Sequence, residues 1–193
     1  LVRVWPVLDH VSRRSLRDYL ARFDDSNAPP SVQGSATILP ETPGLEGLGR
    51  VRDHLVAEVQ RRRPSSTATI DVDASIIESW KHAALYHYDD GRGYQPLFAY
   101  WGEQRLILRD QFRDGNVPAG FALLPFVEAA FVALPPGVVH RYFRSDSAAY
   151  DHALLRWLDR EQIGFAVSAD VGEALRAEWR RGPRESWQPL RRR

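Results

Sequence analysis

The sequence of 193 residues contains no cysteine and no methionine, has a single lysine, Lys81, and lacks any long run of apolar residues. Without cysteine the chain forms no disulfide and no cysteine-ligated zinc site, and a reducing compartment such as the cytoplasm is permitted. Without about 18 consecutive apolar residues, or a basic segment followed by an apolar one, we expect neither a membrane span nor a secretory signal. The first residue is not methionine, which suggests a fragment of a longer reading frame.

The composition is that of a folded protein, since 44% of the residues are hydrophobic and 11% are aromatic. A chain of this length is expected to form one domain, or one domain with a small appendage. The formal net charge is only +1, so the overall charge does not indicate a strongly basic nucleic-acid-binding protein. Any such function must depend on local groups of charges.

The first part of the chain is predicted to be helical. Apolar residues recur at helical spacing over 11–23 and over 50–60. Between these helices, the stretch GLEGLG at 44–49 is predicted to belong to a linker, because its order and context do not fit a dinucleotide-binding loop. Arginines and then Pro64 end the second helix, so a domain boundary is predicted there, before 65–193.

The second part alternates between strand and helix patterns. Strands are predicted over 67–73, 94–101, 105–109, 138–144 and 163–168, and helices over 119–133, 147–160 and 172–181. The order β-β-β-α-β-α-β-α predicts an α/β fold in which a mixed sheet is flanked by helices. This order resembles that of the RNase H-like fold.

Three aspartates lie at the ends of predicted strands. Asp71 and Asp73 share one face at the end of 67–73, and Asp146 directly follows 138–144. If these strands are parallel neighbours, Asp73 and Asp146 come within a few ångströms, since adjacent strands lie about 4.8 Å apart. Two close carboxylates stay ionised together when a cation lies between them, and Mg²⁺ prefers oxygen ligands. The residues therefore indicate a divalent-metal site.

Each aspartate also has a structural interpretation that the residues alone leave open. Asp146 precedes a predicted helix, so its side chain could simply cap the first exposed N–H groups of that helix. Asp71 and Asp73 could cap the turn that follows their strand.

Four strings follow one another along the chain: TIDVDAS at 69–75, GRGYQPL at 91–97, FRDGNVPA at 112–119 and YFRSDS at 142–147. Their succession resembles the DDE-domain transposases of bacterial insertion sequences. The resemblance covers about 65–180. It implies an RNase H-like core that cuts DNA and joins it to a target, using two ions of Mg²⁺ or Mn²⁺.

The resemblance assigns two catalytic acids. The first acid of that family precedes a small residue and Ser or Thr, which corresponds to Asp73, with Asp71 the weaker candidate. The second lies in an R-x-D-S context, which corresponds to Asp146. All three aspartates are expected metal ligands. The third acid of the family is a glutamate beyond an inserted segment, and no matching context occurs here, so we expect a fragment that is inactive or weakly active.

The resemblance also implies DNA as the partner, self-association of the full-length protein and a cytoplasmic, nucleoid-associated location. Residues 1–64 are then expected to bind DNA or to support assembly. The candidates for phosphate contacts near the acids are Arg144, Lys81, Arg92 and Arg113. A solvated or salt-bridged surface is the alternative for each of them.

Two other functions remain open. A transposase remnant would fold and bind DNA without cutting it. An unrelated RNase H-like nuclease would place its last acid on the helix after 163–168, at Glu173 or Glu178; Glu185 is a further available glutamate. The metal-site hypothesis requires that Asp73 and Asp146 share one edge and one face of the sheet.

Overall fold

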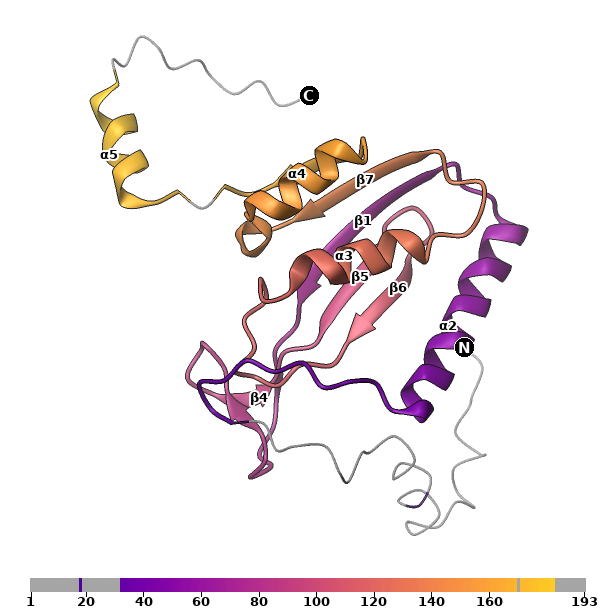
Figure 1. Ribbon diagram of the computed structural model, residues 1–193, viewed down its shortest axis with the longest axis horizontal. Helices are drawn as coiled ribbons and strands as arrows, with labels where there is room; N and C mark the ends of the chain where they lie inside the picture. Colours follow the sequence, from indigo (N-terminus) through magenta and orange to yellow (C-terminus); the bar gives the residue numbers. More distant parts are fainter. Residues whose placement is uncertain (1–17, 19–31, 170, 183–193) are drawn as a thin grey trace, which may run out of the picture.

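The computed structural model describes residues 18, 32–169 and 171–182 of the chain. A five-stranded sheet is the centre of this described part (Figure 1). Its strands lie in the order β6 (Leu106–Gln111), β5 (Leu97–Trp101), β1 (Thr67–Ala74), β7 (His140–Ser145) and β8 (Gly164–Val167). Strand β1 is antiparallel to β5 and parallel to β7, and β8 is parallel to β7. The predicted mixed sheet is confirmed, and its order and directions are those of the RNase H-like fold.

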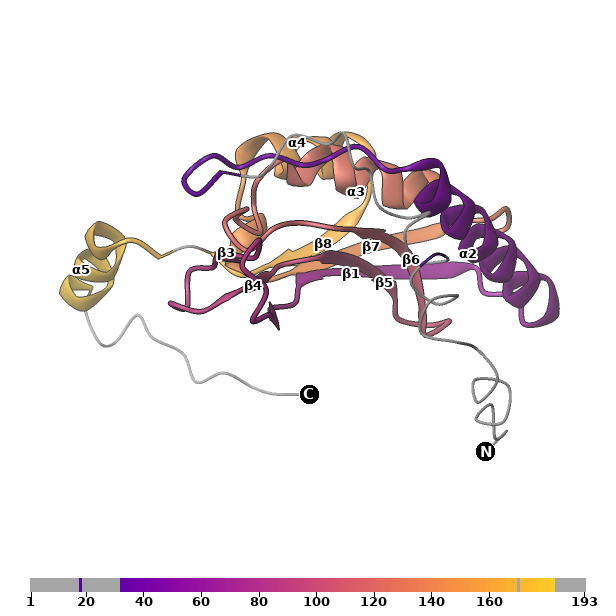
Figure 2. The ribbon, with the colours of Figure 1, turned by 90° about the horizontal axis from the view of Figure 1, so that it is seen from below.

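The hydrophobic core lies between this sheet and helices α3 (Leu123–Val132) and α4 (His152–Arg160), which cover the same face (Figure 2). Alternate side chains supply the sheet side of the core, so that Ile70, Val72 and Phe143 are at most 3% exposed. The intervening side chains of β1 therefore point to the opposite face. In the described part of the chain, no helix covers that face (Figure 2).

Helix α2 (Pro43–Arg62) begins earlier than the sequence pattern indicates. The prediction of a linker over 44–49 is wrong, because these residues form the first turns of the helix. The side chain of Thr42 accepts a hydrogen bond from the backbone N–H of Leu45 (3.3 Å). Pro43 lies in the first turn, where its missing N–H is harmless. Together the cap and the proline fix a helix start that the glycines alone would disfavour.

A second, smaller sheet is absent from the sequence prediction. Its strands lie in the order β2 (Ile77–Glu78), β4 (Arg92–Tyr94) and β3 (Leu85–Tyr86). The strand predicted over 94–101 is therefore two strands, β4 and β5, which separate at Pro96 because proline has no N–H for the ladder. Gly93 allows β4 to approach β2, since a Cβ there would lie 2.4 Å from the carbonyl oxygen of Ile77.

The helix predicted over 147–160 is interrupted. A 3-10 turn, η3 (Ser147–Ala149), comes first. Helix α4 then begins after a cap of its own, in which the Asp151 side chain accepts from the backbone N–H of Leu154 (2.9 Å). The 3-10 turn has a separate cap, Asp146, and these two caps explain why the segment is not one continuous helix.

Helix α5 (Glu173–Arg181) projects away from the sheet and buries none of its side chains (Figure 1). The helix predicted over 11–23 lies outside the described residues apart from Asp18. No helix that the structure describes is long and apolar enough to span a membrane.

Candidate active site

Two of the predicted acids lie at the ends of neighbouring parallel strands. Strands β1 and β7 pair with a constant offset of 73 residues, as in Asp71 opposite Arg144 (144 − 71). Ser145 donates to the carbonyl oxygen of Val72 (2.9 Å), which continues this offset, so Asp73 and Asp146, the residue directly after β7, come to the same end of the two strands. The first and fourth large-sheet strands in chain order are thus parallel neighbours, as the metal-site hypothesis assumes. We refer to Asp73 and Asp146 as the acid pair.

Each carboxylate of the acid pair makes one local hydrogen bond. Asp73 Oδ1 accepts from the N–H of Ala74 (2.8 Å), and Asp146 Oδ1 accepts from the N–H of Ala148 (3.0 Å). The second bond is the helix-cap interaction considered as an alternative for Asp146, and it uses one oxygen. Both side chains are exposed, and no donor among the described residues bonds to their Oδ2 atoms. Capping and cation binding are therefore compatible.

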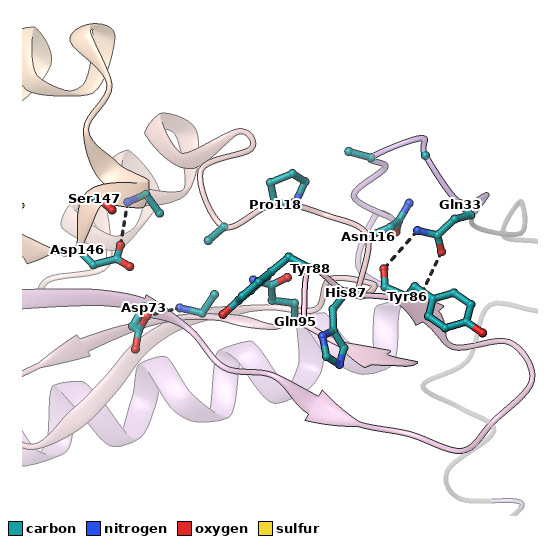
Figure 3. Close-up of a pocket in the computed structure, with 16 residues that line it drawn as sticks. Gln33, Asp73, Tyr86, His87, Tyr88, Gln95, Asn116, Pro118, Asp146 and Ser147 are labelled. Carbon is teal, nitrogen blue, oxygen red and sulfur yellow. Dashed lines mark hydrogen bonds between the residues drawn. The ribbon is translucent and has the colours of Figure 1, made fainter. Parts of the chain in front are cut away.

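Both acids line one pocket of about 800 Å³, and Figure 3 shows them together at one end of it. Amide, imidazole and phenol side chains line the rest: Gln33, Tyr86, His87, Tyr88, Gln95 and Asn116. No lysine or arginine occurs among the described residues that line this pocket. A phosphate group that enters it therefore meets negative charge unless a cation is also bound.

Of the polar side chains in this pocket that the sequence analysis does not assign, three have buried polar groups: His87, Gln95 and Asn116. Gln95 and His87 are only 4% and 7% exposed. His87 Nδ1 accepts from the backbone N–H of Asp89 (3.2 Å), whereas its Nε2 is buried and has no partner in the described part of the chain. Asn116 donates to two backbone carbonyl oxygens at 3.0 Å, and its Oδ1 is likewise buried and unpartnered. Gln95 and Asn116 lie inside two of the family-like strings, but His87 has no such signal.

Asp71 and Arg144 form an ion pair on the uncovered face of the sheet. Arg144 donates from Nε and Nη2 to the two carboxylate oxygens of Asp71, at 2.6 and 2.7 Å. These hydrogen bonds raise the pKa of Arg144 above its usual value. The side chain of Arg144 is 59% exposed and that of Asp71 is 31% exposed. A predicted metal ligand is thus bound to a predicted DNA contact.

Arg113 was a predicted phosphate contact, but it is 1% exposed. Its guanidinium donates to Oε1 of Gln111 (2.9 and 2.7 Å) and to the backbone carbonyl oxygens of Pro118, Ala119 and Phe121 (3.3, 3.2 and 2.9 Å). Burial lowers the pKa of Arg113 to about 10, so the group is still charged at neutral pH. In place of the predicted surface contact, Arg113 holds the loop after β6.

The other two predicted phosphate contacts lie on or beside the small sheet. Lys81 follows β2 and is exposed. Arg92 on β4 donates to the carbonyl oxygens of His82 and Ala84 (3.1 and 3.2 Å), and its guanidinium carbon lies 4.5 Å from the ring centroid of Tyr86. Arg92 is exposed despite these contacts, so both cations are accessible to solvent.

No third acid joins the acid pair in the described part of the chain, where no group of three histidine, cysteine or acidic residues could hold a metal. Glu173 and Glu178 form ion pairs with arginines of their own helix, α5, at 3.4 and 3.9 Å. Neither of them lines the pocket. The alternative nuclease, whose last acid would be one of these two, therefore has no support. Glu185 lies outside the described residues.

Fold and pocket together define a class of protein: an RNase H-like domain with paired carboxylates at adjacent strand ends. A comparison with known protein families matches residues 21–191 to the transposase DDE domain, group 1. This match spans most of the sequence, so the chain belongs to that family of transposases, the DDE proteins of mobile elements that act in DNA recombination. A search of curated proteins finds no match.

Proposed function

We propose that this chain carries the catalytic centre of a DNA transposase, with Asp73 and Asp146 as its first two acids. Two observations carry this proposal: β1 and β7 pair in parallel, and Asp73 and Asp146, at the ends of these strands, line one pocket. In the proposed reaction, water cleaves the DNA strand at the end of the element. The freed 3′-hydroxyl group then attacks a phosphodiester of the target DNA, and the old ester oxygen leaves.

The donor set of the acid pair fits Mg²⁺ or Mn²⁺. Each carboxylate has one oxygen without a hydrogen bond among the described residues, and hard cations prefer such oxygens. When bound, one ion or two would neutralise charge on the reacting phosphate and activate the attacking oxygen. The protein itself fixes the two carboxylates, through the β1–β7 pairing and through the backbone bonds to Ala74 and Ala148.

DNA is the partner that the family implies, and three exposed cations are proposed to contact its phosphates: Arg144, Lys81 and Arg92. All three are absent from the lining of the acidic pocket. The strand backbone would therefore be held from outside the pocket while the reacting phosphate lies at the acid pair. Since each neutralised phosphate releases counterions, binding should weaken steeply with salt and depend little on DNA sequence.

Metal titration of the acid pair tests this proposal. Mn²⁺ binding, measured by calorimetry, should weaken in Asp73→Asn and in Asp146→Asn by on the order of tenfold or more, the scale set by losses of even outer-shell partners. Asp159→Asn is the matched control, because it removes one exposed carboxylate from α4 outside the pocket. Identical isotherms for the wild type and both acid-pair variants would contradict the proposal.

A second candidate function is DNA binding without cleavage, as in a catalytically dead remnant. It is favoured by the lack of a third acid near the acid pair within the described residues. Nicking of supercoiled plasmid in the presence of Mn²⁺ separates the two functions. Nicking that disappears in Asp73→Asn supports the enzyme, whereas DNA binding with no nicking by the wild-type chain supports the remnant.

A further inference from the structure

The ion pair between Asp71 and Arg144 lies one step along the strands from the acid pair. Asp71 precedes Asp73 by two residues on β1, and Arg144 of β7 precedes by two residues Asp146, which directly follows that strand. Side chains two residues apart share a face of a strand and are separated by roughly 6–7 Å. The ion pair therefore shares the face of the sheet to which Asp73 points. It leans toward Gly102, because Asp71 Oδ2 and Arg144 Nη2 would lie 3.8 and 4.0 Å from a Cβ at that position.

The bonding of Arg144 leaves one side of its guanidinium available. Its Nε and Nη2 are both bound to Asp71, whereas Nη1 has no hydrogen-bond partner in the part of the chain that the structure describes. Asp71, the less exposed partner, belongs to the central strand β1, and the more exposed Arg144 belongs to the neighbouring strand β7. A fork-to-fork pair of this kind fixes the plane of the guanidinium as well as its position.

The same geometry argues against Asp71 as a metal ligand. Both of its carboxylate oxygens are occupied by Arg144. A divalent cation would have to displace the guanidinium and would then lie beside its positive charge. Asp71 and Asp73 thus have different surroundings although they are neighbours on one face, because only Asp71 has an arginine opposite it on β7.

We propose that Asp71 is a positioning residue whose carboxylate holds the Arg144 guanidinium on the uncovered face of the sheet, where Nη1 binds a phosphate of the DNA strand. This inference rests on the proposed function, since it takes DNA as the ligand and the acid pair as the metal site. It reassigns Asp71, the third predicted metal ligand, to DNA binding.

Whether Asp71→Asn strengthens or weakens DNA binding tests the proposal. Near a polyanion, removal of a carboxylate should tighten binding if only net charge matters. Because Asp71→Asn also releases Arg144, we expect it to weaken binding of a fluorescent mixed-sequence duplex at low salt by about threefold or more. Arg144→Ala should weaken it at least as much and make the slope of log affinity against log salt shallower by about 1.

Two further variants isolate the coupling. In the Arg144→Ala background, Asp71→Asn should no longer weaken DNA binding, and Asp71→Glu, which keeps the charge, should retain most of the wild-type affinity. Glu103→Gln is the control, since Glu103 bonds to the side chain and backbone of Thr69 on the same strand (2.7 and 2.8 Å). Removal of the Glu103 charge should leave DNA binding unchanged or make it tighter. Thermal denaturation confirms that each variant is folded.

Three outcomes would overturn the inference: unchanged or tighter DNA binding by Asp71→Asn, additive effects of the two substitutions, or no duplex binding by the wild-type chain at low salt. Titration with Mn²⁺ alone separates this inference from the proposed function. Asp71→Asn should bind Mn²⁺ as the wild type does. If Asp71→Asn loses as much Mn²⁺ affinity as Asp73→Asn does, Asp71 is a metal ligand and the inference fails. If neither acid-pair substitution changes the Mn²⁺ isotherm, the proposed function fails, but the DNA-binding result for Asp71 and Arg144 is unaffected.

Discussion

Two arginines belong to the family-like strings but lie in different surroundings. Arg113 is in the loop after β6, and Arg144 is near the end of β7. The guanidinium of Arg113 is surrounded by carbonyl oxygens and has no access to solvent, whereas that of Arg144 has one acidic partner and is largely exposed. Arg113 therefore stabilises a loop, and Arg144 is available to a ligand. The two roles cannot be told from the residue type or from the family-like strings. They follow from the number and kind of hydrogen-bond acceptors around each guanidinium.

The comparison is tested most strongly by Arg113→Ala. This change would leave the carbonyl oxygens of the loop and Oε1 of Gln111 without their buried donor. We expect the free energy of unfolding to fall by about 3 kcal/mol or more, since bonds to a charged donor contribute about 1.5–3 kcal/mol each. Urea denaturation measures the loss. A change below about 1 kcal/mol would contradict a structural role for Arg113.

Gly115 offers a second test of the same loop. A Cβ at this position would lie 2.7 Å from the carbonyl oxygen of Leu85 and 2.8 Å from that of Gly93. Because both atoms belong to the backbone, Gly115→Ala should destabilise the fold by about 1–3 kcal/mol. Thermal unfolding checks this value, and Gly47→Ala is the control, because only a flexible arginine side chain lies near its added methyl group. Equal stability of the two variants would show that the loop can move.

Arg144→Ala should change stability much less than Arg113→Ala. The ion pair with Asp71 is substantially exposed, and such pairs contribute about 0–1 kcal/mol. We therefore expect a loss of at most about 1 kcal/mol in urea denaturation, together with the weaker DNA binding described above. A loss as large as that of Arg113→Ala would show that the two arginines share a structural role.

The smallest expected effect concerns Glu103, next to the ion pair. Partial burial raises the pKa of this carboxyl, but its hydrogen bonds, those from Thr69 foremost, together outweigh that effect and the net pKa is lowered. The lowered pKa means that the stabilising contribution is present above the ordinary pKa of 4.5 and is lost as the pH falls through the folded-state value. The difference in stability between the wild type and Glu103→Gln should shrink as the pH falls below about 4.5. A difference that grows toward acid would have the wrong sign.

The strands of the large sheet could be predicted from the sequence because each of them has an alternating or continuous apolar pattern. It was also sufficient to predict that the two strands ending near Asp73 and Asp146 are parallel neighbours, because parallel pairing of two predicted strands has few alternatives. The small sheet was not predictable in this way, since its strands have only two or three residues and no periodicity.

Two other features depend on contacts that no local pattern shows. The start of α2 depends on a cap at Thr42 that outweighs a glycine-rich stretch. The burial of Arg113 depends on carbonyl oxygens five to eight residues further along the chain, which the loop turns toward the guanidinium. The bond between Asp71 and Arg144 likewise requires the register of β1 and β7, which a sequence pattern alone does not fix.

The pairing of β1 with β7 also bears on how the chain folds. Contacts between residues 73 positions apart form only after a long loop has closed, which makes them slow relative to local helices and hairpins. The antiparallel strands β1, β5 and β6 lie close in sequence and can pair before β7 arrives. If the acid pair is the metal site that we propose, cation affinity should emerge during refolding together with the docking of β7, because the pair is complete only when β7 has joined β1.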